Sequence, residues 1–414
     1  MGRTACAQGA LSEWPFSRDT TVRYVDARTG LPVVGMIGAG QLARMTHQAA
    51  ISLGLSLRVL ADSADDSAAQ VAGVVAIGDY RSLDDLRAFA ASCDVITLDH
   101  EHVPNEHLEV LGKDVAVHPS ADAVRYAQDK ALMRARLSEL GLPVPEWIDL
   151  TGSRDPADTL AAFGAAVGWP VVLKTITGGY DGKGVWLIES PEAATDLLAS
   201  GVRLLAEACV PIARELAAVV ARSPYGQGAT WPVVETVQHD GICVEVIAPA
   251  PGLAGSVADD AQRVALRIAS ELGVTGVLAV ELFETVTGAL VVNELAMRPH
   301  NSAHWTIEGA RTSQFEQHLR AVLDYPLGMT TMTAPVVVMA NVLAGPAVVR
   351  PASIDERVHH CLAAWPDVKI HLYGKQFRPG RKVGHVTALG LDVDLVRGRA
   401  RSAARYLMNG GELP

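Results

Sequence analysis

The chain has 414 residues, of which 49% are hydrophobic and 20% are charged, and its formal net charge at pH 7 is −11. A chain of this length is too long for one compact core, so two or three domains are expected. The acidic balance argues against a nucleic-acid partner, which needs a basic surface, but it admits phosphorylated ligands because a bound metal ion can supply positive charge.

No apolar run approaches the roughly 18 residues that a helix needs to cross a bilayer, so no membrane partner is expected. The five cysteines are scattered and show no CxxC spacing, which favours free thiols in a reducing cytoplasm over disulfides or a zinc site. Residues 1–31 lack both periodicity and the apolar segment of a secretory signal. They are predicted to be a disordered extension or an over-long start.

The first structured unit is predicted to begin at Pro32 as an apolar strand, a helix and a second strand that ends at Asp62. Gly35, Gly38 and Gly40 lie at the first turn of this βαβ unit. A glycine turn followed by an acidic residue about 20 positions later also fits a dinucleotide site, although the spacing departs from GxGxxG. Such a turn at a helix N-terminus can equally bind another phosphate or simply allow close packing.

A later strand of the same unit carries four polar residues at its carboxyl end, where ligands bind in open parallel sheets. These residues are Asp99, His100, Glu101 and His102. Consecutive residues of an extended chain alternate between faces, so only two of the four are expected to point the same way. Metal binding is therefore less favoured than a hydrogen bond to a polar substrate, with Glu101 as the candidate and a solvated loop as the alternative.

A helix is predicted after Ser120, which is a favourable N-cap, with Gly141 to end it. Its basic side chains do not form a single stripe. Most of them are therefore expected to be solvated, although Arg125 could reach a ligand. These side chains are Arg125, Lys130, Arg134 and Arg136.

Two short apolar runs within residues 171–188 flank a loop with glycines at positions 178, 179, 182 and 184. Such loops let backbone N–H groups approach an anion because no Cβ blocks the way. Lys174 ends the first run and Lys183 lies in the loop, so two cations could meet the same anion. The pattern predicts an anion cradle, with an ordinary hairpin and a flexible tip as the alternative.

A second informative stretch contains two apolar runs around a predicted hairpin tip at Thr287-Gly288. A hairpin centred there places Glu281 directly opposite Glu294. Opposed Cβ atoms lie about 4.5–5.5 Å apart, where like charges repel, so the pair calls for a cation, and carboxylates suit Mg²⁺. Asn293 is a neighbour of Glu294 and is not expected to share its face, yet a metal ion could bridge them. Exposed strand glutamates are the alternative.

Polar side chains crowd the segment after Glu294 and indicate a pocket for a polar ligand, with a structural turn as the alternative. They are Arg298, His300, Asn301, Ser302, His304 and Trp305. The C-terminal part is β-rich, and its residues 375–382 hold four cations around a Pro-Gly turn. In an acidic protein this run favours an anion-binding element over a solvated patch.

The order of these motifs resembles the ATP-grasp superfamily, in which two α/β lobes clamp a nucleotide beneath a glycine-rich loop. More closely, the chain is similar to the N5-carboxyaminoimidazole ribonucleotide synthase family of purine biosynthesis. The similarity covers everything from about Val33 onward, and TGGYDGKG and NELAMRPHNSAHWT are its most specific parts. The matching segments are IGAGQLARM, TLDHEHVP, QDK, LKTITGGYDGKGV, VETVQHDGI, AVELF, NELAMRPHNSAHWT, SQFEQHLRA and YGKQFRPGRKVGH.

The resemblance implies a multidomain fold of the α/β and α+β classes. After the extension at residues 1–31, an N-terminal open parallel α/β sheet would occupy residues 32–118. ATP-grasp lobes would occupy residues 119–328, and a small β-rich C-terminal domain would occupy residues 329–414.

The resemblance also implies roles for individual residues. The ATP-binding set would be Arg125, Lys174, Gly179, Tyr180, Asp181, Gly182, Lys183, Gly184, Val185, Glu207, Ala208, Cys209, Val210, Glu215, Gln238, Asn293 and Glu294. The substrate would contact Glu101, Tyr180, Asp181, Lys183, Lys375 and Arg381. Glu281 and Glu294 would ligate Mg²⁺, and the catalytic set would be Lys183, Tyr180, Asp181 and Arg298.

Some of these implied roles are more specific. The segment from Glu207 to Val210 would contact the adenine through backbone and side chain, and Glu215 would contact the ribose hydroxyls. Lys375 and Arg381 would hold the 5′-phosphate of the substrate. The family usually has histidine where Gln238 stands, which puts a nucleotide contact at that position in doubt, and Ala43 replaces a common glycine.

The implied activity is ATP-dependent carboxylation of 5-aminoimidazole ribonucleotide with bicarbonate through carboxyphosphate, with ATP and Mg²⁺ as cofactors, in a cytoplasmic homodimer. Phosphoryl transfer relies on positioning and charge neutralisation, which fits a site without an obvious nucleophile. Three alternatives stay open at this point. They are another ATP-grasp ligase such as a formate-using ribonucleotide transformylase, an inactive nucleotide-binding regulatory protein, and a dinucleotide oxidoreductase built on the first βαβ unit.

Overall fold

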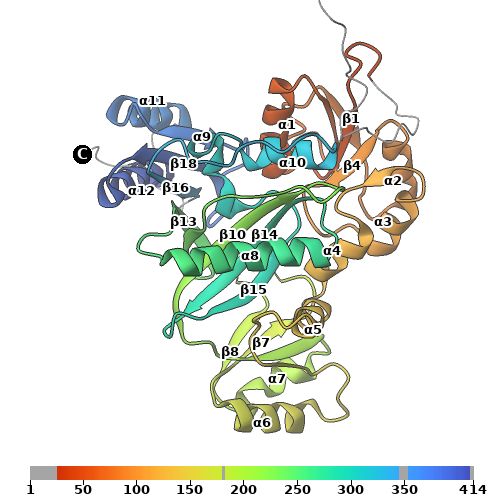
Figure 1. The fold of residues 1–414 in the computed structure, drawn as a ribbon, viewed down its shortest axis with the longest axis vertical. Helices are drawn as coiled ribbons and strands as arrows, with labels where there is room; N and C mark the ends of the chain where they lie inside the picture. The colour runs from red at the N-terminus through yellow and green to blue at the C-terminus, as the bar shows by residue number, and fades with distance from the viewer. Residues whose placement is uncertain (1–25, 180–181, 345–352, 411–414) are drawn as a thin grey trace, which may run out of the picture.

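The computed structural model describes residues 26–179, 182–344 and 353–410. Figure 1 shows the N-terminal and C-terminal parts of the chain side by side at one end of the molecule and a small lobe at the other end, with the central sheet between them. Among the described residues, no helix is long and apolar enough to cross a membrane.

The N-terminal unit is a five-stranded parallel sheet with the strand order β3-β2-β1-β4-β5. Strand β1 is buried along its whole length because apolar clusters cover both faces of the sheet, as is usual for parallel sheets. The predicted open parallel α/β unit is therefore confirmed. Its elements are β1 (Val33–Ile37), α1 (Gln41–Ser52), β2 (Ser56–Ala61), β3 (Val74–Ile77), α2 (Leu83–Ala90), β4 (Val95–Leu98), α3 (Asn105–Leu111) and β5 (Ala116–Val117).

The single helix predicted after Ser120 is in fact two helices, α4 (Ala121–Gln128) and α5 (Lys130–Glu139). They meet at Asp129, whose backbone is extended (φ −129°, ψ 110°) and whose side chain caps α5. Because of this break, the N–H of Lys130 donates to a backbone carbonyl of the small lobe at 2.9 Å. The backbone of Lys130 therefore contacts the small lobe.

The small lobe is a four-stranded antiparallel sheet with the order β6-β9-β7-β8, packed on a core that it shares with α6 and η1. The hairpin of β7 and β8 carries the glycine-rich loop, as predicted. The elements of the lobe are β6 (Trp147–Asp149), α6 (Pro156–Val167), β7 (Val171–Thr175), β8 (Val185–Ile188), η1 (Pro191–Ala194), α7 (Thr195–Ala199) and β9 (Leu204–Ala208).

The central sheet has nine strands in the order β15-β14-β10-β12-β13-β16-β18-β17, with β11 paired to β10. Helix α8 (Gly255–Glu271) covers one face of it. The strands of the central part are β10 (Ile212–Arg222), β11 (Gly228–Thr230), β12 (Val234–His239), β13 (Ile242–Ala248), β14 (Gly276–Thr285) and β15 (Leu290–Ala296).

The β-rich C-terminal part continues the central sheet, because β16 pairs antiparallel with β13. Helix α12 packs on these last strands, and α10 packs between the central sheet and the N-terminal unit. The remaining elements are η2 (Asn301–Ala303), α9 (Thr306–Gly309), α10 (Gln314–Val322), β16 (Val336–Leu343), α11 (Ile354–Ala364), β17 (Lys369–Leu372), β18 (Lys382–Gly390) and α12 (Val393–Asn409).

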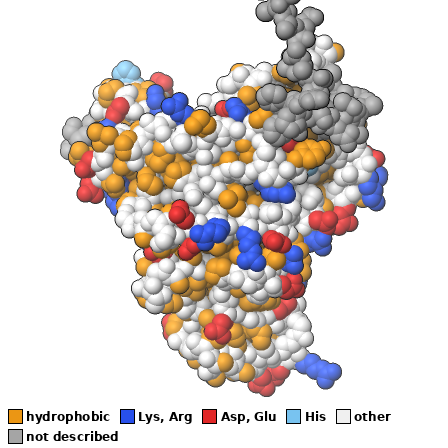
Figure 2. Space-filling model, in the orientation of Figure 1, with side chains coloured by type: hydrophobic (Ala, Val, Ile, Leu, Met, Phe, Trp, Pro, Cys, Tyr) orange, Lys and Arg blue, Asp and Glu red, His pale blue; other side chains and the backbone are white. Residues whose placement is uncertain are grey.

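Figure 2 shows the face of the molecule that carries α8. Positive and negative side chains are interspersed across this face. It therefore offers no broad basic surface of the kind that binds a nucleic-acid backbone.

Candidate active site

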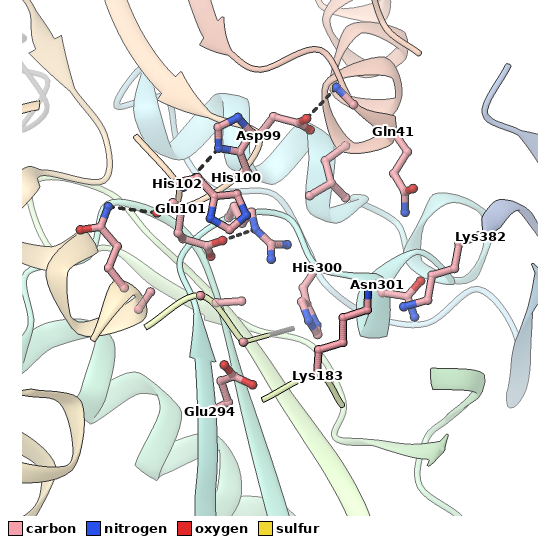
Figure 3. Close-up of a pocket in the computed structure, with 18 of the residues that line it drawn as sticks. Gln41, Asp99, His100, Glu101, His102, Lys183, Glu294, His300, Asn301 and Lys382 are labelled. Carbon is pink, nitrogen blue, oxygen red and sulfur yellow. Dashed lines mark hydrogen bonds and ion pairs between the residues drawn. The ribbon is translucent and has the colours of Figure 1, made fainter. Parts of the chain in front are cut away.

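The parts of the molecule meet at an open cavity of about 1120 Å³ (Figure 3). The N-terminal unit contributes the start of α1 and the turn after β4, and the central sheet contributes residues of β14 and β15. The glycine-rich loop of the small lobe and residues of the 375–382 run complete the wall. One cavity thus collects the predicted anion cradle, carboxylate pair and basic run.

The turn after β4 brings four consecutive polar residues to the cavity, Asp99, His100, Glu101 and His102. The alternation predicted for an extended chain is wrong here, because the chain bends as soon as β4 ends. Gln128 holds the bend, since its Nε2 donates to two carbonyl oxygens of the turn at 2.9 and 2.7 Å.

Asp99 closes the glycine turn at the start of α1. Its carboxylate accepts hydrogen bonds from the N–H groups of Gly40 at 2.6 Å and Ala43 at 2.8 Å. A Cβ on Gly40 would collide with this carboxylate, which explains the glycine. The helix N-terminus that would hold the pyrophosphate of a dinucleotide is therefore occupied by a side chain of the protein itself, which argues against the oxidoreductase alternative.

Glu101 joins the N-terminal unit to the central sheet. Its Oε2 accepts from Arg298 Nε at 2.6 Å and its Oε1 accepts from the N–H of Met297 at 3.1 Å. Although burial opposes the charge, the pKa of Arg298 is raised because of the Glu101 carboxylate. Both carboxylate oxygens of the predicted substrate residue thus already have protein partners, and Glu101 orients Arg298 on the cavity wall.

Lys174, Glu207 and Arg134 form a buried ionic cluster beside the cavity. Glu207 accepts from Arg134 Nε at 2.6 Å and from Lys174 Nζ at 2.8 Å. Burial alone would raise the pKa of Glu207, but the two cations hold it below its usual value. Burial lowers the pKa of Lys174 despite Glu207. The prediction that most basic side chains of this helix are solvated is wrong for Arg134, whose side chain is 0% exposed.

The predicted pairing of the carboxylates is confirmed, because Glu281 lies opposite Glu294 in the register of β14 and β15. The register shifts by one residue directly after Glu281, so Asn293 forms a bulge. The bulge turns Asn293 toward Glu281, whose Oε2 accepts from Asn293 Nδ2 at 3.5 Å. The expectation that Asn293 and Glu294 do not share a face therefore fails at this bulge, where both residues lie beside Glu281.

This cluster has the composition of a magnesium site. Burial, followed by repulsion from Glu294 and Glu215, raises the pKa of Glu281 to about 7. Burial and the neighbouring carboxylates therefore disfavour the charged form of Glu281. Lys130 Nζ approaches Glu294 Oε1 at 2.8 Å, and His300 Nε2 approaches Glu281 Oε1 at 3.4 Å. The two carboxylates are donors that Mg²⁺ prefers, whereas the amide oxygen of Asn293 accepts from Lys174 Nζ at 3.0 Å.

The glycine-rich loop contributes Gly178, Gly179 and Lys183 to the cavity wall. Gly182 has φ +75°, and a Cβ there would lie 3.0 Å from the Cα of Gly241 in the turn between β12 and β13. The loop can therefore adopt this path only with glycine at that point. Tyr180 and Asp181 lie outside the described residues.

The basic run lines the cavity from the C-terminal side through Lys375, Arg378, Arg381 and Lys382. Lys183 and Arg298 reach the same space from the small lobe and the central part. Cations from three parts of the chain thus line a single cavity, whereas Lys174, the other cation of the predicted anion cradle, lies in the ionic cluster beside it. The carboxylates of Glu281 and Glu294 line the same cavity.

Several residues of the predicted ATP set lie away from the described cavity wall. Arg125 is exposed on α4 and ion-paired with Asp122. Gln238 hydrogen-bonds Glu215, whose pKa is raised by burial. At the end of β9, Glu207 is committed to the ionic cluster, and the residues that follow it are Ala208, exposed Cys209 and Val210.

Sequence reasoning did not predict that Lys130 and Gln41 line the cavity. It also gave no structural role to Gln128, which holds the turn after β4, or to Asp99, which closes the glycine turn. Lys130 lines the cavity beside Glu294, which only the helix break at Asp129 explains. An Asp followed by Lys in the middle of a helical pattern was a usable signal, since Asp favours an N-cap over a helix interior. Nothing in the sequence placed Gln41 beside a lysine 334 positions away.

Three family models match the chain in order. Residues 31–128 match the ribonucleotide synthetase preATP-grasp domain, and residues 135–315 match the ATP-grasp domain. Residues 337–399 match the phosphoribosylaminoimidazole carboxylase C-terminal domain.

Among curated proteins, the N5-carboxyaminoimidazole ribonucleotide synthase of Mycobacterium bovis is 59% identical over 384 residues, which cover 92% of this chain and 88% of that protein. The enzyme of the same name from Corynebacterium ammoniagenes is 49% identical over 394 residues, which cover 92% of this chain and 93% of that protein.

Among solved structures, an N5-carboxyaminoimidazole ribonucleotide synthetase in complex with ADP has a TM-score of 0.82 and 32% identity, covering 90% of this chain and 96% of that chain. The Aspergillus clavatus N5-carboxyaminoimidazole synthase with ADP and 5-aminoimidazole ribonucleotide has a TM-score of 0.82 and 30% identity, covering 91% and 98%. The resemblance seen in the motifs is confirmed: the chain belongs to the N5-carboxyaminoimidazole ribonucleotide synthase family of ATP-grasp ligases.

Proposed function

We propose that this protein uses ATP and bicarbonate to carboxylate the amine of 5-aminoimidazole ribonucleotide, giving N5-carboxyaminoimidazole ribonucleotide, ADP and phosphate in purine biosynthesis. The observation that carries the proposal is the continuity of the cavity. It joins Glu281 and Glu294 to the basic run at residues 375–382 without an intervening wall. A single space can therefore hold a metal-bound nucleotide and a phosphorylated second substrate together.

The nucleotide would lie between the central sheet and the small lobe. Lys174, buried and hydrogen-bonded to Asn293 Oδ1 at 3.0 Å, would face its phosphates, with the backbone of the glycine-rich loop above them. Mg²⁺ would be held by Glu281 and Glu294, with Asn293 beside them, and it would neutralise phosphate charge. The segment after Glu207 would supply backbone contacts to the adenine.

The ribonucleotide would lie on the opposite side of the same cavity. Lys375 and Arg381 would bind its 5′-phosphate, because both belong to the basic run and both line the wall. Glu101 would act on the substrate mainly through Arg298, whose guanidinium it orients. Tyr180, Asp181 and Lys183 of the loop remain proposed contacts to both substrates.

The chemistry would proceed in two steps. A bicarbonate oxygen attacks the γ-phosphorus of ATP, the bond to the β-phosphate oxygen breaks, and carboxyphosphate and ADP form. The amine nitrogen of the ribonucleotide then attacks the carboxyl carbon of carboxyphosphate, phosphate leaves, and the nitrogen loses a proton. Lys183 and Arg298 would stabilise the negative charge that develops in the first step. The closed loop would exclude water from the labile intermediate.

The test is a turnover assay with purified protein. ADP release should require both bicarbonate and 5-aminoimidazole ribonucleotide, and ¹³C from labelled bicarbonate should appear as a carbamate carbon in the product. Formate in place of bicarbonate should give no turnover. ADP release that does not respond to the ribonucleotide, or a formylated product, would contradict the substrate assignment.

We further propose that the domains end near residues 118 and 328, that the protein is a homodimer, and that it works in the cytoplasm. The three family-model matches, at residues 31–128, 135–315 and 337–399, support a division into three parts. Limited proteolysis tests the boundaries, and light scattering of the purified protein tests the dimer, for which a monomer mass would be the contrary result.

A further inference from the structure

The segment that carries Lys375 into the cavity is held by the N-terminal unit. Three side chains of that unit reach it from more than 300 positions away in the chain. Ser67 Oγ donates to the carbonyl of Tyr373 at 2.5 Å, and Gln70 Nε2 donates to the carbonyl of Gly374 at 2.9 Å. Lys375 Nζ donates to Gln41 Oε1 at 2.6 Å.

This contact is built tightly at the backbone. Ser67 and Tyr373 are 3% and 1% exposed. Arg44 Nη1 donates to the carbonyl of Ser67 at 2.7 Å and thereby holds the backbone of Ser67 in place. Gly374 has φ +66°, and a Cβ there would collide with Gln70 and lie 3.0 Å from Arg44 Nη1. A glycine is thus required where the two units meet.

Lysine is a point charge on a flexible stem, so its position depends on what holds it. Lys375 has Gln41 as a neutral acceptor on one side, and its Nζ lies 5.6 Å from the centre of the Tyr373 ring. The hydrogen bond to Gln41 therefore holds the ammonium group of Lys375 on the cavity wall.

We propose that Gln41 is a positioning residue that orders Lys375 for the phosphate of the ribonucleotide, with Ser67 and Gln70 as the backbone part of the same clamp. This inference rests on the function proposed above. Its consequence is that the N-terminal unit, through the first residue of α1, sets the affinity for a ligand held by the C-terminal part.

The test compares Gln41→Met with Gln48→Met in steady-state kinetics. Gln48 lies on the same helix but is exposed, so it controls for the chemical change. Loss of a hydrogen bond to a charged group should raise KM for the ribonucleotide about tenfold. The KM for ATP should stay within about twofold, and Gln48→Met should match the wild type.

A double-mutant cycle shows whether Gln41 acts through Lys375. If it does, Gln41→Met combined with Lys375→Met should be no worse than Lys375→Met alone. Additive effects, an unchanged KM for the ribonucleotide, or an equal rise in both KM values would each overturn the inference.

Two further measurements keep the test decisive. If Gln41→Met does not fold, as judged by its thermal midpoint, Gln70→Met tests the clamp from outside the cavity, and a rise in the same KM is expected. A wild-type protein that does not consume the ribonucleotide at all would refute the proposed function. A wild type that turns over normally beside an unaffected Gln41→Met would refute only the clamp.

Discussion

At the scale of single residues, the site depends on charged side chains that lie close together. Glu281 and Glu294 face each other across a strand pair, and Glu207 lies between Arg134 and Lys174. A buried charge is tolerated only when a partner compensates it. The carboxylate pair is therefore tested by metal binding, and the ionic cluster around Glu207 is tested by the stability of the fold.

Replacing Glu294 with Gln should lower Mg²⁺-dependent turnover by at least about 100-fold, because one of two charged oxygen ligands is lost. Turnover and Mg²⁺ binding by calorimetry measure the effect. Glu271→Gln on the exposed end of α8 is the matched control and should behave as the wild type. Near-normal turnover of Glu294→Gln would rule out its role as a metal ligand.

Replacing Arg134 with Met should destabilise the fold by about 3–5 kcal/mol, since it leaves Glu207 buried with one cation instead of two. Arg136→Met is the control on the same helix. Its side chain is 34% exposed and pairs with Glu139 at the surface, so a loss within about 1 kcal/mol is expected. Urea unfolding measures both, and equal losses would contradict the buried-cluster argument.

At the scale of elements, local irregularities place the functional groups. The break between α4 and α5 turns Lys130 to Glu294, and the bulge in β15 turns Asn293 to Glu281. A regular helix and a regular hairpin would have left both side chains pointing elsewhere. Bulges are known to re-aim side chains beside active sites, and this one does so.

The glycine-rich loop makes a further prediction. Gly182→Ala should lower turnover about tenfold, because a side chain at φ +75° costs roughly 1–2 kcal/mol and its Cβ also meets Gly241. Gly201→Ala is the control, since it has φ +74° but nothing within 4 Å of its Cβ. Kinetics with varied ATP measure the change. If Gly201→Ala loses as much turnover, the loop is not the cause.

At the scale of the whole molecule, α10 joins the N-terminal sheet to the central sheet through His318. The N–H of Val277 in β14 donates to His318 Nδ1 at 3.1 Å, so the ring proton is on Nε2, which donates to Thr97 Oγ1 of β4 at 2.7 Å. Burial lowers the pKa of His318 to about 3. The neutral ring is therefore part of the contact between the two units.

This contact predicts a loss of stability in acid. Between pH 6.5 and about 3 the unfolded chain protonates this histidine and the folded one does not. The free energy of unfolding should therefore fall by about 1.4 kcal/mol per pH unit from this group as pH decreases through that window. The free energy of unfolding of His318→Gln, measured with urea from pH 7 to 5, should change less steeply with pH. The difference in slope should correspond to the uptake of one proton. Exposed His359→Gln is the control and should keep the wild-type slope.

The sequence by itself determined the classes of the elements and the chemistry of the site. Apolar runs around a glycine turn predicted the βαβ unit, and paired apolar runs around turn residues predicted the hairpins. Hairpin symmetry placed Glu281 opposite Glu294, and the glycines with Lys174 and Lys183 predicted an anion cradle. These inferences are local, since each depends on residues within one strand pair or one loop.

The tertiary structure decided which of these local features meet and which way individual side chains face. The bend after β4 and the side chain of Asn293 at the bulge have partners in other parts of the chain, so periodicity could not predict them, whereas the break at Asp129 had a local signal in its N-cap. The contact between Gln41 and Lys375 is the extreme case, because the two residues are 334 positions apart in the chain. Hydrogen bonds between distant segments leave no repeating pattern in a single sequence, so they become visible only when the chain is folded.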